Sequence, residues 1–284
     1  MPAVPQPPEA PPFVHARTPR RLRSPSTPKP LNALILAAGR GRRLLPYTSE
    51  RPKCLLQVGP CTILEHQLQR LSAAGVERVT IVAGFGAEAV RRRAQACGPP
   101  HVRVVYNPFF AISDNLVSLW SARSEIGEDT LLLNGDNVFH PAVLEPLLDA
   151  DPGPCTLLVH RKSAYDEDDM KVALRGSRLT GIGKGLLAAQ AQAESIGIMR
   201  IAGDGGRLLR RVLEEAVEDA DAMHGFYLDG VRRMAEAGCR VRCVDIGSLP
   251  WSDVDTADDL LEVRLHVEAY EAGAPEAAAL REPA

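Results

Sequence analysis

The sequence lacks an excess of charge of one sign, and it lacks any long apolar run. Its 284 residues carry 33 basic and 36 acidic side chains, which gives a formal net charge of −3. A chain this close to neutral gives no electrostatic reason to bind a nucleic acid. Apolar runs such as Ala33–Ala38 are far shorter than the roughly 20 residues of a membrane-spanning helix. We therefore expect neither a nucleic-acid-binding protein nor a membrane protein.

The six cysteines are scattered, and none of them forms a CxxC pair. No histidine lies near them at the spacing of a zinc finger, and their number and spacing do not suggest a disulfide framework. Reduced and mostly buried thiols are therefore the expected state. Such cysteine usage is typical of a cytoplasmic protein, and this is the location that we expect.

The signatures of several enzyme classes are absent as well. The sequence has no GxSxG elbow, and its seven histidines are too dispersed to suggest a Ser-His-Asp triad. A GxxxxGK[ST] phosphate loop is missing, and so is the third glycine of a dinucleotide-binding fingerprint. No internal repeat is visible.

The two ends of the chain differ from its middle in composition. Residues 1–30 hold ten of the 23 prolines and several arginines, so we expect a Pro/Arg-rich tail without fixed structure. The Arg20–Arg21 pair is not followed by the apolar segment of a secretory signal. Residues 271–284 are rich in Ala, Glu and Pro and are expected to fray.

Between residues 31 and 270 the pattern predicts one α/β domain with two lobes. In the half formed by residues 31–150, short apolar segments alternate with segments of helical periodicity. This alternation predicts βαβ units and a doubly wound, mostly parallel sheet. The half formed by residues 151–270 is less regular, and its strands are expected to extend the sheet and build a smaller acceptor-binding lobe. The expected strands are 31–36, 78–83, 102–106, 130–133, 155–160, 170–174, 179–182, 195–201, 240–245 and 251–255, and the expected helices are 63–74, 88–96, 116–126, 207–218, 225–237 and one from 256.

The loop after the first expected strand carries the strongest local signal. Ligands of open α/β sheets lie at the carboxyl ends of the strands. This loop reads Leu36-Ala37-Ala38-Gly39-Arg40-Gly41-Arg42-Arg43, and Pro52-Lys53 follows it. Gly39 and Gly41 would let backbone amides approach a phosphate closely, and Arg43 and Lys53 add two cations. The pattern predicts a phosphate-binding loop, although two solvated loop cations are the alternative.

Carboxylates follow two further strands. Asp136 comes after the fourth expected strand, and Asp253 and Asp255 would project from one face of a late extended segment. Carboxylate oxygens are the ligands that Mg²⁺ prefers, so these residues predict a magnesium site. Alternatively, Asp136 makes an Asx turn, and Thr256 caps the next helix with Asp259 at the third helical position.

Taken together, Ala37-Ala38-Gly39-x-Gly41-x-Arg43-Leu44 and Pro52-Lys53 resemble the signature of the nucleotidylyltransferases that make nucleoside-diphosphate sugars and alcohols. The resemblance covers roughly residues 31–265 and implies a Rossmann-like, nucleotide-diphospho-sugar transferase-like fold. It implies that Arg43 and Lys53 are catalytic and neutralise phosphate charge. It also implies Mg²⁺ on Asp136 and Asp253, with Asp255 as a second ligand or a hydrogen-bond partner of the loop. The implied nucleotide contacts are Leu36, Ala37, Ala38, Gly39, Gly41 and Gly84.

Other segments favour one branch of this family. Asp114-Asn115-Leu116-Val117-Ser118-Leu119-Trp120 stands where sugar-nucleotide enzymes have Gly-Thr-Ala or Gly-Leu-Ala. This segment is more similar to cytidylyltransferases that act on phosphocholine, inositol phosphate or small phosphonates, and so are Asp168–Val172 and Ile182–Lys184. The resemblance implies CTP and a small phosphate or phosphonate as substrates. The implied acceptor contacts are Asn115, Ser118, Lys171, Lys184 and Glu194, although Asp166–Asp169 is alternatively only a charged loop.

Two alternatives of function stay open at this point. One is a hexose-1-phosphate uridylyl- or thymidylyltransferase, against which the Asn115 segment argues. The other is a non-catalytic nucleotide-sensing subunit. A pure sensor need not keep both cations, Arg43 and Lys53, together with both carboxylates, Asp136 and Asp253.

Overall fold

The computed structural model describes residues 31–148 and 153–271. The expected tails, residues 1–30 and all but the first residue of 271–284, lie outside these ranges. Within them, no helix has both the length and the apolar character needed to cross a bilayer. All six cysteines fall in the described part of the chain and none is paired, as the sequence predicts.

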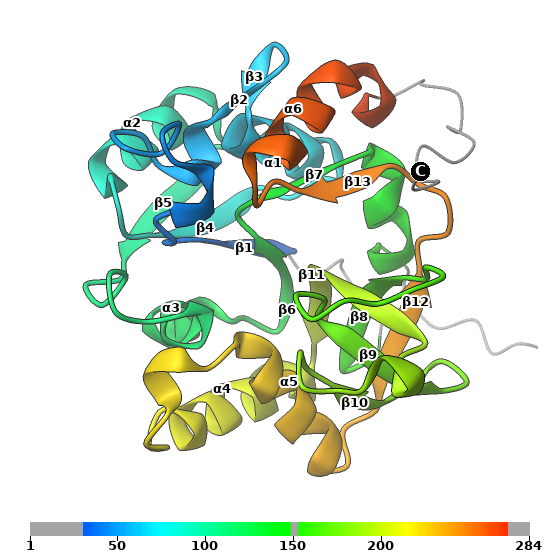
Figure 1. The fold of residues 1–284 in the computed structure, drawn as a ribbon. Coiled ribbons are helices and arrows are strands. Elements are labelled where there is room, and N and C mark those ends of the chain that lie inside the picture. Colours follow the sequence, from blue (N-terminus) through cyan, green and yellow to red (C-terminus); the bar gives the residue numbers. More distant parts are fainter. Residues whose placement is uncertain (1–30, 149–152, 272–284) are drawn as a thin grey trace, which may run out of the picture.

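A nine-stranded mixed sheet forms the centre of the molecule, in the order β5-β4-β1-β6-β11-β8-β12-β10-β9 (Figure 1). The first four strands in this order pair in parallel, as expected for βαβ units. β11 then pairs antiparallel with both β6 and β8, so the second half of the sheet is mainly antiparallel. The strands are β1 (Asn32–Ala37), β4 (Arg78–Ala83), β5 (His101–Tyr106), β6 (Asp129–Asn134), β8 (Cys155–His160), β9 (Lys171–Arg175), β10 (Arg178–Ile182), β11 (Ala193–Ala202) and β12 (Val241–Asp245).

The second half of the sheet closes on itself. β11 has ten residues, and its first two also pair with β9. The ladder therefore runs from β11 through β8, β12, β10 and β9 back to β11, which makes a closed ring of five strands. A register shift between Ser195 and Met199 marks the place where β11 bends from the main sheet into the ring. Closure leaves β9 without the free edge that it would otherwise expose.

Helices cover both faces of the sheet (Figure 1). α1 (Ile63–Ala73) and α2 (Ala87–Cys97) lie on one face. α3 (Asn115–Ser121), α4 (Asp204–Ala216) and α5 (Tyr227–Glu236) lie on the other. The helix expected over residues 116–126 is wrong in its second part, because the chain leaves the α-helix after Ser121 and forms a 3-10 turn at Arg123–Glu125.

Two short strand pairs and a last helix complete the fold. β2 (Gln57–Val58) pairs with β3 (Cys61–Thr62), and β7 (Asn137–Phe139) pairs with β13 (Trp251–Asp253). α6 (Ala257–Leu265) packs near them over a small core of its own. The strand expected over residues 251–255 thus ends at Asp253, and the next two residues form the turn that leads into α6.

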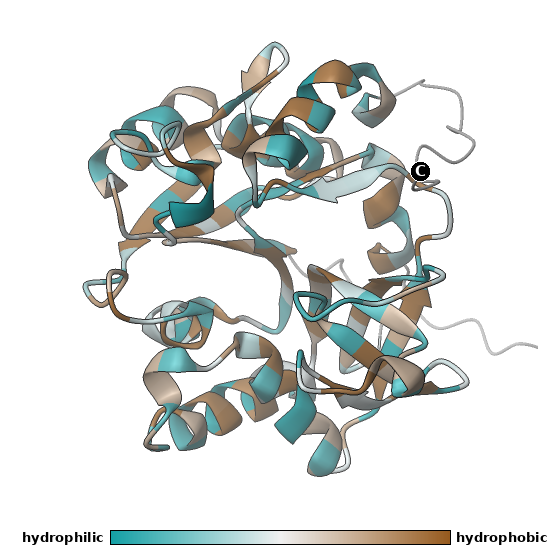
Figure 2. Cartoon of the chain, in the orientation of Figure 1, coloured by the Kyte–Doolittle hydropathy of each residue, from teal (hydrophilic) through white to brown (hydrophobic). Residues whose placement is uncertain are grey.

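The strand that carries the glycine-rich loop is buried on both faces. Leu34 and Leu36 of β1 point into the core beneath α3, α4 and α5, whereas Ala33 and Ile35 point into the core beneath α1 and α2. On the helical side of this core, α4 alternates hydrophobic and hydrophilic residues along its length, as Figure 2 shows. Burial on both faces explains the continuous apolar run in β1, and it gives the loop at its carboxyl end a rigid support.

Candidate active site

A cavity of about 330 Å³ lies at the carboxyl ends of β1 and β6. The loop after β1 forms one wall, the start of α3 another, and the turn before α6 closes a third side. Most residues expected to bind the nucleotide or perform catalysis meet here. The expected residues that line the cavity are Leu36, Ala37, Ala38, Gly39, Gly41, Arg43, Lys53, Asn115, Ser118, Asp136 and Asp255.

The two glycines of the first loop have different roles. Gly41 has a positive φ of 61°, and a Cβ there would lie 3.1 Å from side-chain atoms of Lys53 and Thr48. The Thr48 hydroxyl also donates to the Gly41 carbonyl at 2.7 Å. Gly41 thus makes the turn and leaves room for Lys53 to enter the cavity. Gly39 has open space where a Cβ would be, so its backbone is accessible from the cavity.

Lys53 lies between two carboxylates. Its Nζ donates to Asp136 Oδ2 at 2.8 Å and also to Asp255 Oδ1. The side chain is only 13% exposed. Burial pulls the pKa of Lys53 down, but the charges and hydrogen bonds of Asp136 and Asp255 outweigh this effect, so the pKa is raised. Lys53 therefore stays a cation at neutral pH although it is almost buried.

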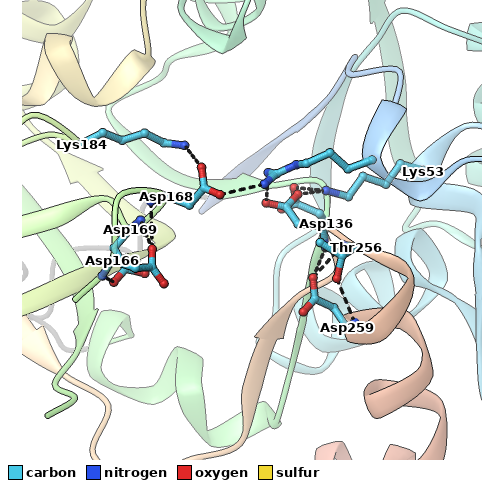
Figure 3. Close-up of polar contacts among 10 residues, drawn as sticks. Lys53, Asp136, Asp166, Asp168, Asp169, Lys184, Thr256 and Asp259 are labelled. Carbon is cyan, nitrogen blue, oxygen red and sulfur yellow. Dashed lines mark hydrogen bonds and ion pairs between the residues drawn. The ribbon is translucent and has the colours of Figure 1, made fainter. Parts of the chain in front are cut away.

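Arg43 connects this pair to the second lobe. Its guanidinium donates to Asp255 Oδ2 at 2.7 Å and to Asp168 Oδ2 at 3.3 Å. Lys184 donates to the other oxygen of Asp168 at 3.2 Å. The result, which Figure 3 shows, is a charge chain in which cations and carboxylates alternate across the cavity mouth. Its members in order are Lys184, Asp168, Arg43, Asp255, Lys53 and Asp136.

Asp255 is the carboxylate of the late segment that faces the cavity. Loss of hydration pushes the pKa of Asp255 up, but Lys53, Arg43 and Lys184 outweigh it and lower the pKa. Asp253 does not line the cavity: β13 ends at this residue, so the two carboxylates do not share one face of a strand. Solvent still reaches Asp253, yet nearby protein displaces part of its hydration and, with Asp136 and Asp255, raises its pKa to about 6.

The turn before α6 holds Asp255 in place. Asp259 accepts hydrogen bonds from the amides of Thr256 at 2.7 Å and Asp255 at 3.0 Å. The Thr256 hydroxyl accepts in return from the Asp259 amide at 3.2 Å. This capping box is the helix-start alternative that the sequence suggested, and it is confirmed. The helix cap at Thr256 does not exclude a role of Asp255 in the site. The cap holds the backbone of Asp255, whose carboxylate contacts Arg43 and Lys53.

Asp136 has an oxygen that no protein group satisfies. Its Oδ2 accepts from Lys53, but its Oδ1 is buried and has no hydrogen-bond partner. A buried carboxylate oxygen of this kind is costly unless a cation or a donor arrives. In the described ranges, no three Asp, Glu, His or Cys side chains are assembled to hold a metal. Mg²⁺ usually takes one or two carboxylates and completes its shell with water and substrate phosphates, so an ion at Asp136 would need such further ligands.

Three residues that were expected in the site, Lys171, Glu194 and Gly84, do not line the cavity. Lys171 is buried and donates to the backbone carbonyl of Asp166 at 2.6 Å. Glu194 is buried beside it on β11 and pairs with His160 and Lys162. Both lie on strands of the five-strand ring, where β9 pairs with β11, and neither lines the cavity. A Cβ on Gly84 would lie 2.2 Å from Phe110, so close packing explains this glycine, which does not line the cavity.

Some residues of the site carried no usable signal in the sequence. Phe226 and Phe110 line the cavity, but both are single aromatic residues without a motif. Cys54 also lines the cavity, but in the sequence it is a single cysteine that belongs to no motif of its own. Asp168 belonged to a run that was open to interpretation as a charged loop, and only the fold brings it to Arg43. Lys184 lines a second cavity, of about 430 Å³, which shares Phe226 with the first.

Part of the chain matches a known protein family, and the chain is similar to two curated relatives. Residues 33–164 match the family described as the MobA-like NTP transferase domain. The chain is 43% identical over 119 residues to the CMP-5'-(3-aminopropyl)phosphonate synthase of Streptomyces rubellomurinus, which is 42% of this chain and 19% of that protein. It is 31% identical over 235 residues to the bifunctional IPC transferase and DIPP synthase of Rubrobacter xylanophilus, covering 81% of this chain and 50% of that protein.

The fold matches solved structures over nearly the whole described chain. The CTP:phosphocholine cytidylyltransferase of Streptococcus pneumoniae superposes with a TM-score of 0.71 at 20% identity, over 84% of this chain and 100% of that one. The chain spans at most half the length of the two curated relatives named above. These matches show that residues 33–164 form a MobA-like NTP transferase domain, and that the chain has the nucleotide-diphospho-sugar transferase-like fold of the solved structures.

Proposed function

We propose that the chain is a cytidylyltransferase that joins CTP to a small phosphorylated alcohol or phosphonate. The observation that carries this proposal is the charge chain, which spans from the glycine-rich loop to the second lobe. Its three cations, Lys184, Arg43 and Lys53, suit a reaction that brings the acceptor's phosphate or phosphonate to the triphosphate of CTP. The CMP-phosphonate product in the name of the Streptomyces rubellomurinus relative supports the same choice.

The proposed reaction is a single displacement. An oxygen of the acceptor's phosphate or phosphonate attacks the α-phosphorus of CTP and forms a new O–P bond. The bond between the α-phosphorus and the oxygen that bridges to the β-phosphate breaks, and pyrophosphate leaves with that electron pair. The acceptor oxygen is already anionic at neutral pH, so no protein nucleophile is needed. Cys54 is not suited to be one, because burial raises the pKa of its thiol to about 12.

Arg43 and Lys53 are proposed to neutralise charge on the triphosphate. In the absence of substrate, Asp255 holds both cations and Asp168 holds the first. The incoming phosphates would take over these hydrogen bonds, so the cations are already aligned when substrate arrives. Alignment and charge neutralisation are the main sources of rate in phosphoryl transfer. The backbone of residues 36–41 is proposed to approach the nucleotide, with Asn115 and Ser118 on the opposite wall.

Mg²⁺ is the proposed metal. Asp136 would hold it through the unpartnered Oδ1, and Asp255 or Asp253 would supply a second carboxylate. Bound there, Mg²⁺ would supply further neutralisation of charge at the α-phosphate. The capping box of Thr256 and Asp259 would keep Asp255 oriented when Arg43 and Lys53 turn to the phosphates.

The test is pyrophosphate release in the presence of Mg²⁺ from the four NTPs crossed with phosphocholine, inositol 1-phosphate, 2-aminoethylphosphonate and glucose 1-phosphate. We expect release with CTP and one of the first three acceptors. Release with UTP or dTTP and glucose 1-phosphate would assign the chain to the sugar-nucleotide enzymes instead. If the folded protein is silent with every pair, the proposal is wrong and a nucleotide-sensing role becomes the better account.

A further inference from the structure

The second cavity adjoins the first on the side of the five-strand ring. Its volume is about 430 Å³, and Phe226 belongs to the walls of both cavities. The charged residues in its wall are Lys184 and Asp229. Asp229 is occupied at the start of α5, where its carboxylate accepts from the Phe226 amide at 3.0 Å. The remaining walls are mostly apolar: Met170, Ile182, Leu186 and Leu228.

The ammonium group of Lys184 rests between an aromatic ring and a carboxylate. Its Nζ lies 5.5 Å from the centre of the Phe226 ring. It also lies 3.2 Å from Asp168 Oδ1. An aromatic face and a carboxylate are the two kinds of group that attract an ammonium ion most directly. The chain's own lysine thus marks a place at the cavity mouth that is built for a primary ammonium group.

Asp168 is well held for such a role although its side chain is 74% exposed. The amides of Asp168 and Asp169 donate to Asp166 Oδ1 at 2.9 and 3.1 Å. Asp169 accepts from Lys162 at 2.7 Å, and Lys171 holds the Asp166 carbonyl. Figure 3 shows the contacts of Asp166 with Asp168 and Asp169. The carboxylate of Asp168 is therefore fixed near the cations of both lobes.

Substrate binding would leave Asp168 without its cations. In the proposed reaction, Arg43 turns to the triphosphate, and Lys184 is the cation of the second cavity that is available to the acceptor's phosphate or phosphonate. Asp168 would then lie beside two groups of phosphate oxygens with no positive partner. Negative charges brought side by side repel one another. A positive group on the acceptor would restore the balance.

We infer that Asp168 and Phe226 bind a primary ammonium group carried by the acceptor, in the place that the Lys184 ammonium group occupies in this structure. This rests on the proposed function and narrows its acceptor to a short aminoalkyl phosphonate or aminoalkyl phosphate. A trimethylammonium group has no N–H to donate to Asp168. A polyol would bury hydroxyl groups against apolar walls that offer few partners.

The experiment compares two acceptors of the same size, 2-aminoethylphosphonate and n-propylphosphonate, with the full chain, CTP and Mg²⁺. We expect kcat/KM to be about tenfold or more higher for the amine, the size of effect typical of a charge-assisted hydrogen bond. In Asp168→Asn the ratio of the two kcat/KM values should fall close to one. In Phe226→Leu it should fall part of the way. Phosphocholine should rank below 2-aminoethylphosphonate with the native chain.

Glu167→Gln is the matched control, because it removes a neighbouring exposed charge from the same loop and should keep the ratio. Turnover of both phosphonates at equal efficiency, or an unchanged ratio in Asp168→Asn, would overturn the inference and leave the proposed function standing. Silence with every acceptor and NTP would instead remove the proposed function. In that case, calorimetric binding of the two phosphonates with CTP in metal-free buffer decides the inference, since equal affinities contradict it.

Discussion

The two ends of strand β6 both hold buried ion pairs, and they differ in one respect. At the amino end, Arg200 donates to both oxygens of Asp129, at 2.7 and 2.6 Å, and to the Leu147 carbonyl. Beyond the carboxyl end, Lys53 joins Asp136 and Asp255, but Asp136 keeps a buried oxygen without a partner. Both arrangements take charges out of water, yet only the first satisfies its carboxylate completely.

This difference separates a structural ion pair from a candidate binding site. A satisfied pair has no further hydrogen bond to offer, so its role is to hold β6 against β11. An unsatisfied carboxylate beside a cavity is costly until a ligand arrives, and such cost is tolerated where a ligand does arrive. The position agrees, because ligands of α/β sheets lie at the carboxyl ends of strands.

Lys53→Met should give the largest effect on activity. The substitution keeps the length of the side chain and removes the charge that is proposed to neutralise the phosphates. Pyrophosphate release should fall by about 10²–10³ in rate. The protein should still fold, with a thermal midpoint lowered less than in the variant described next. Activity close to that of the native chain would contradict the role given to Lys53. The ion pairs at both ends of β6 would then be structural.

Arg200→Met should give the largest effect on stability. It leaves the nearly buried carboxylate of Asp129 without its cation, which typically costs about 3–5 kcal/mol of unfolding free energy. Urea unfolding measures this loss, and kcat per folded molecule should not change. The double variant Arg200→Met/Asp129→Leu should recover part of the stability. If kcat falls in the folded variant, the amino end of β6 is coupled to the site.

His66 offers a smaller test in the same part of the fold. It lies on α1, with Nε2 2.9 Å from the Phe139 carbonyl of β7, and burial followed by Arg70 lowers its pKa to about 4. In the unfolded chain the pKa of this histidine is near 6.5. Between about pH 6.5 and 4, His66 is therefore protonated in the unfolded chain and neutral in the folded chain. Stability should therefore fall as the pH drops from about 7 towards 4, by at most about 1.4 kcal/mol per pH unit.

His66→Gln should remove this slope, as measured by urea unfolding between pH 5 and 7. The difference between the two proteins isolates the histidine, because Asp253, with a pKa of about 6, titrates in the same window in both. Equal slopes in the native chain and the variant would show that His66 binds a proton in the folded state as readily as in the unfolded one.

The sequence predicted the first half of the fold well because its signals are local. The strands expected at 31–36 and 78–83 lie within one residue of β1 and β4, since each is a continuous apolar run between turn residues. β2, β3 and β7 have only two or three residues and no such run, so they escaped prediction.

The site was predictable where one loop carries it and not where distant segments meet. The cavity lining around Gly39, Arg43 and Lys53 follows from a single motif and its strand. The surroundings of Lys171 depend on β9 pairing with both β10 and β11, which no local pattern reveals. The contact between Asp168 and Arg43 joins residues 125 positions apart, and only the folded chain brings them together.

The closed ring has a consequence for how this protein could be altered. The loop that carries Asp168 leaves β8 at His160 and returns at Lys171 in β9, and both strands have partners on each side. Their register is thus fixed independently of the loop between them, as in scaffolds whose loops vary freely. If the proposed function holds, exchanging residues 161–170 for those of a relative should transfer acceptor preference while nucleotide preference stays with the first lobe. Selectivity for the two substrates would then be open to separate engineering.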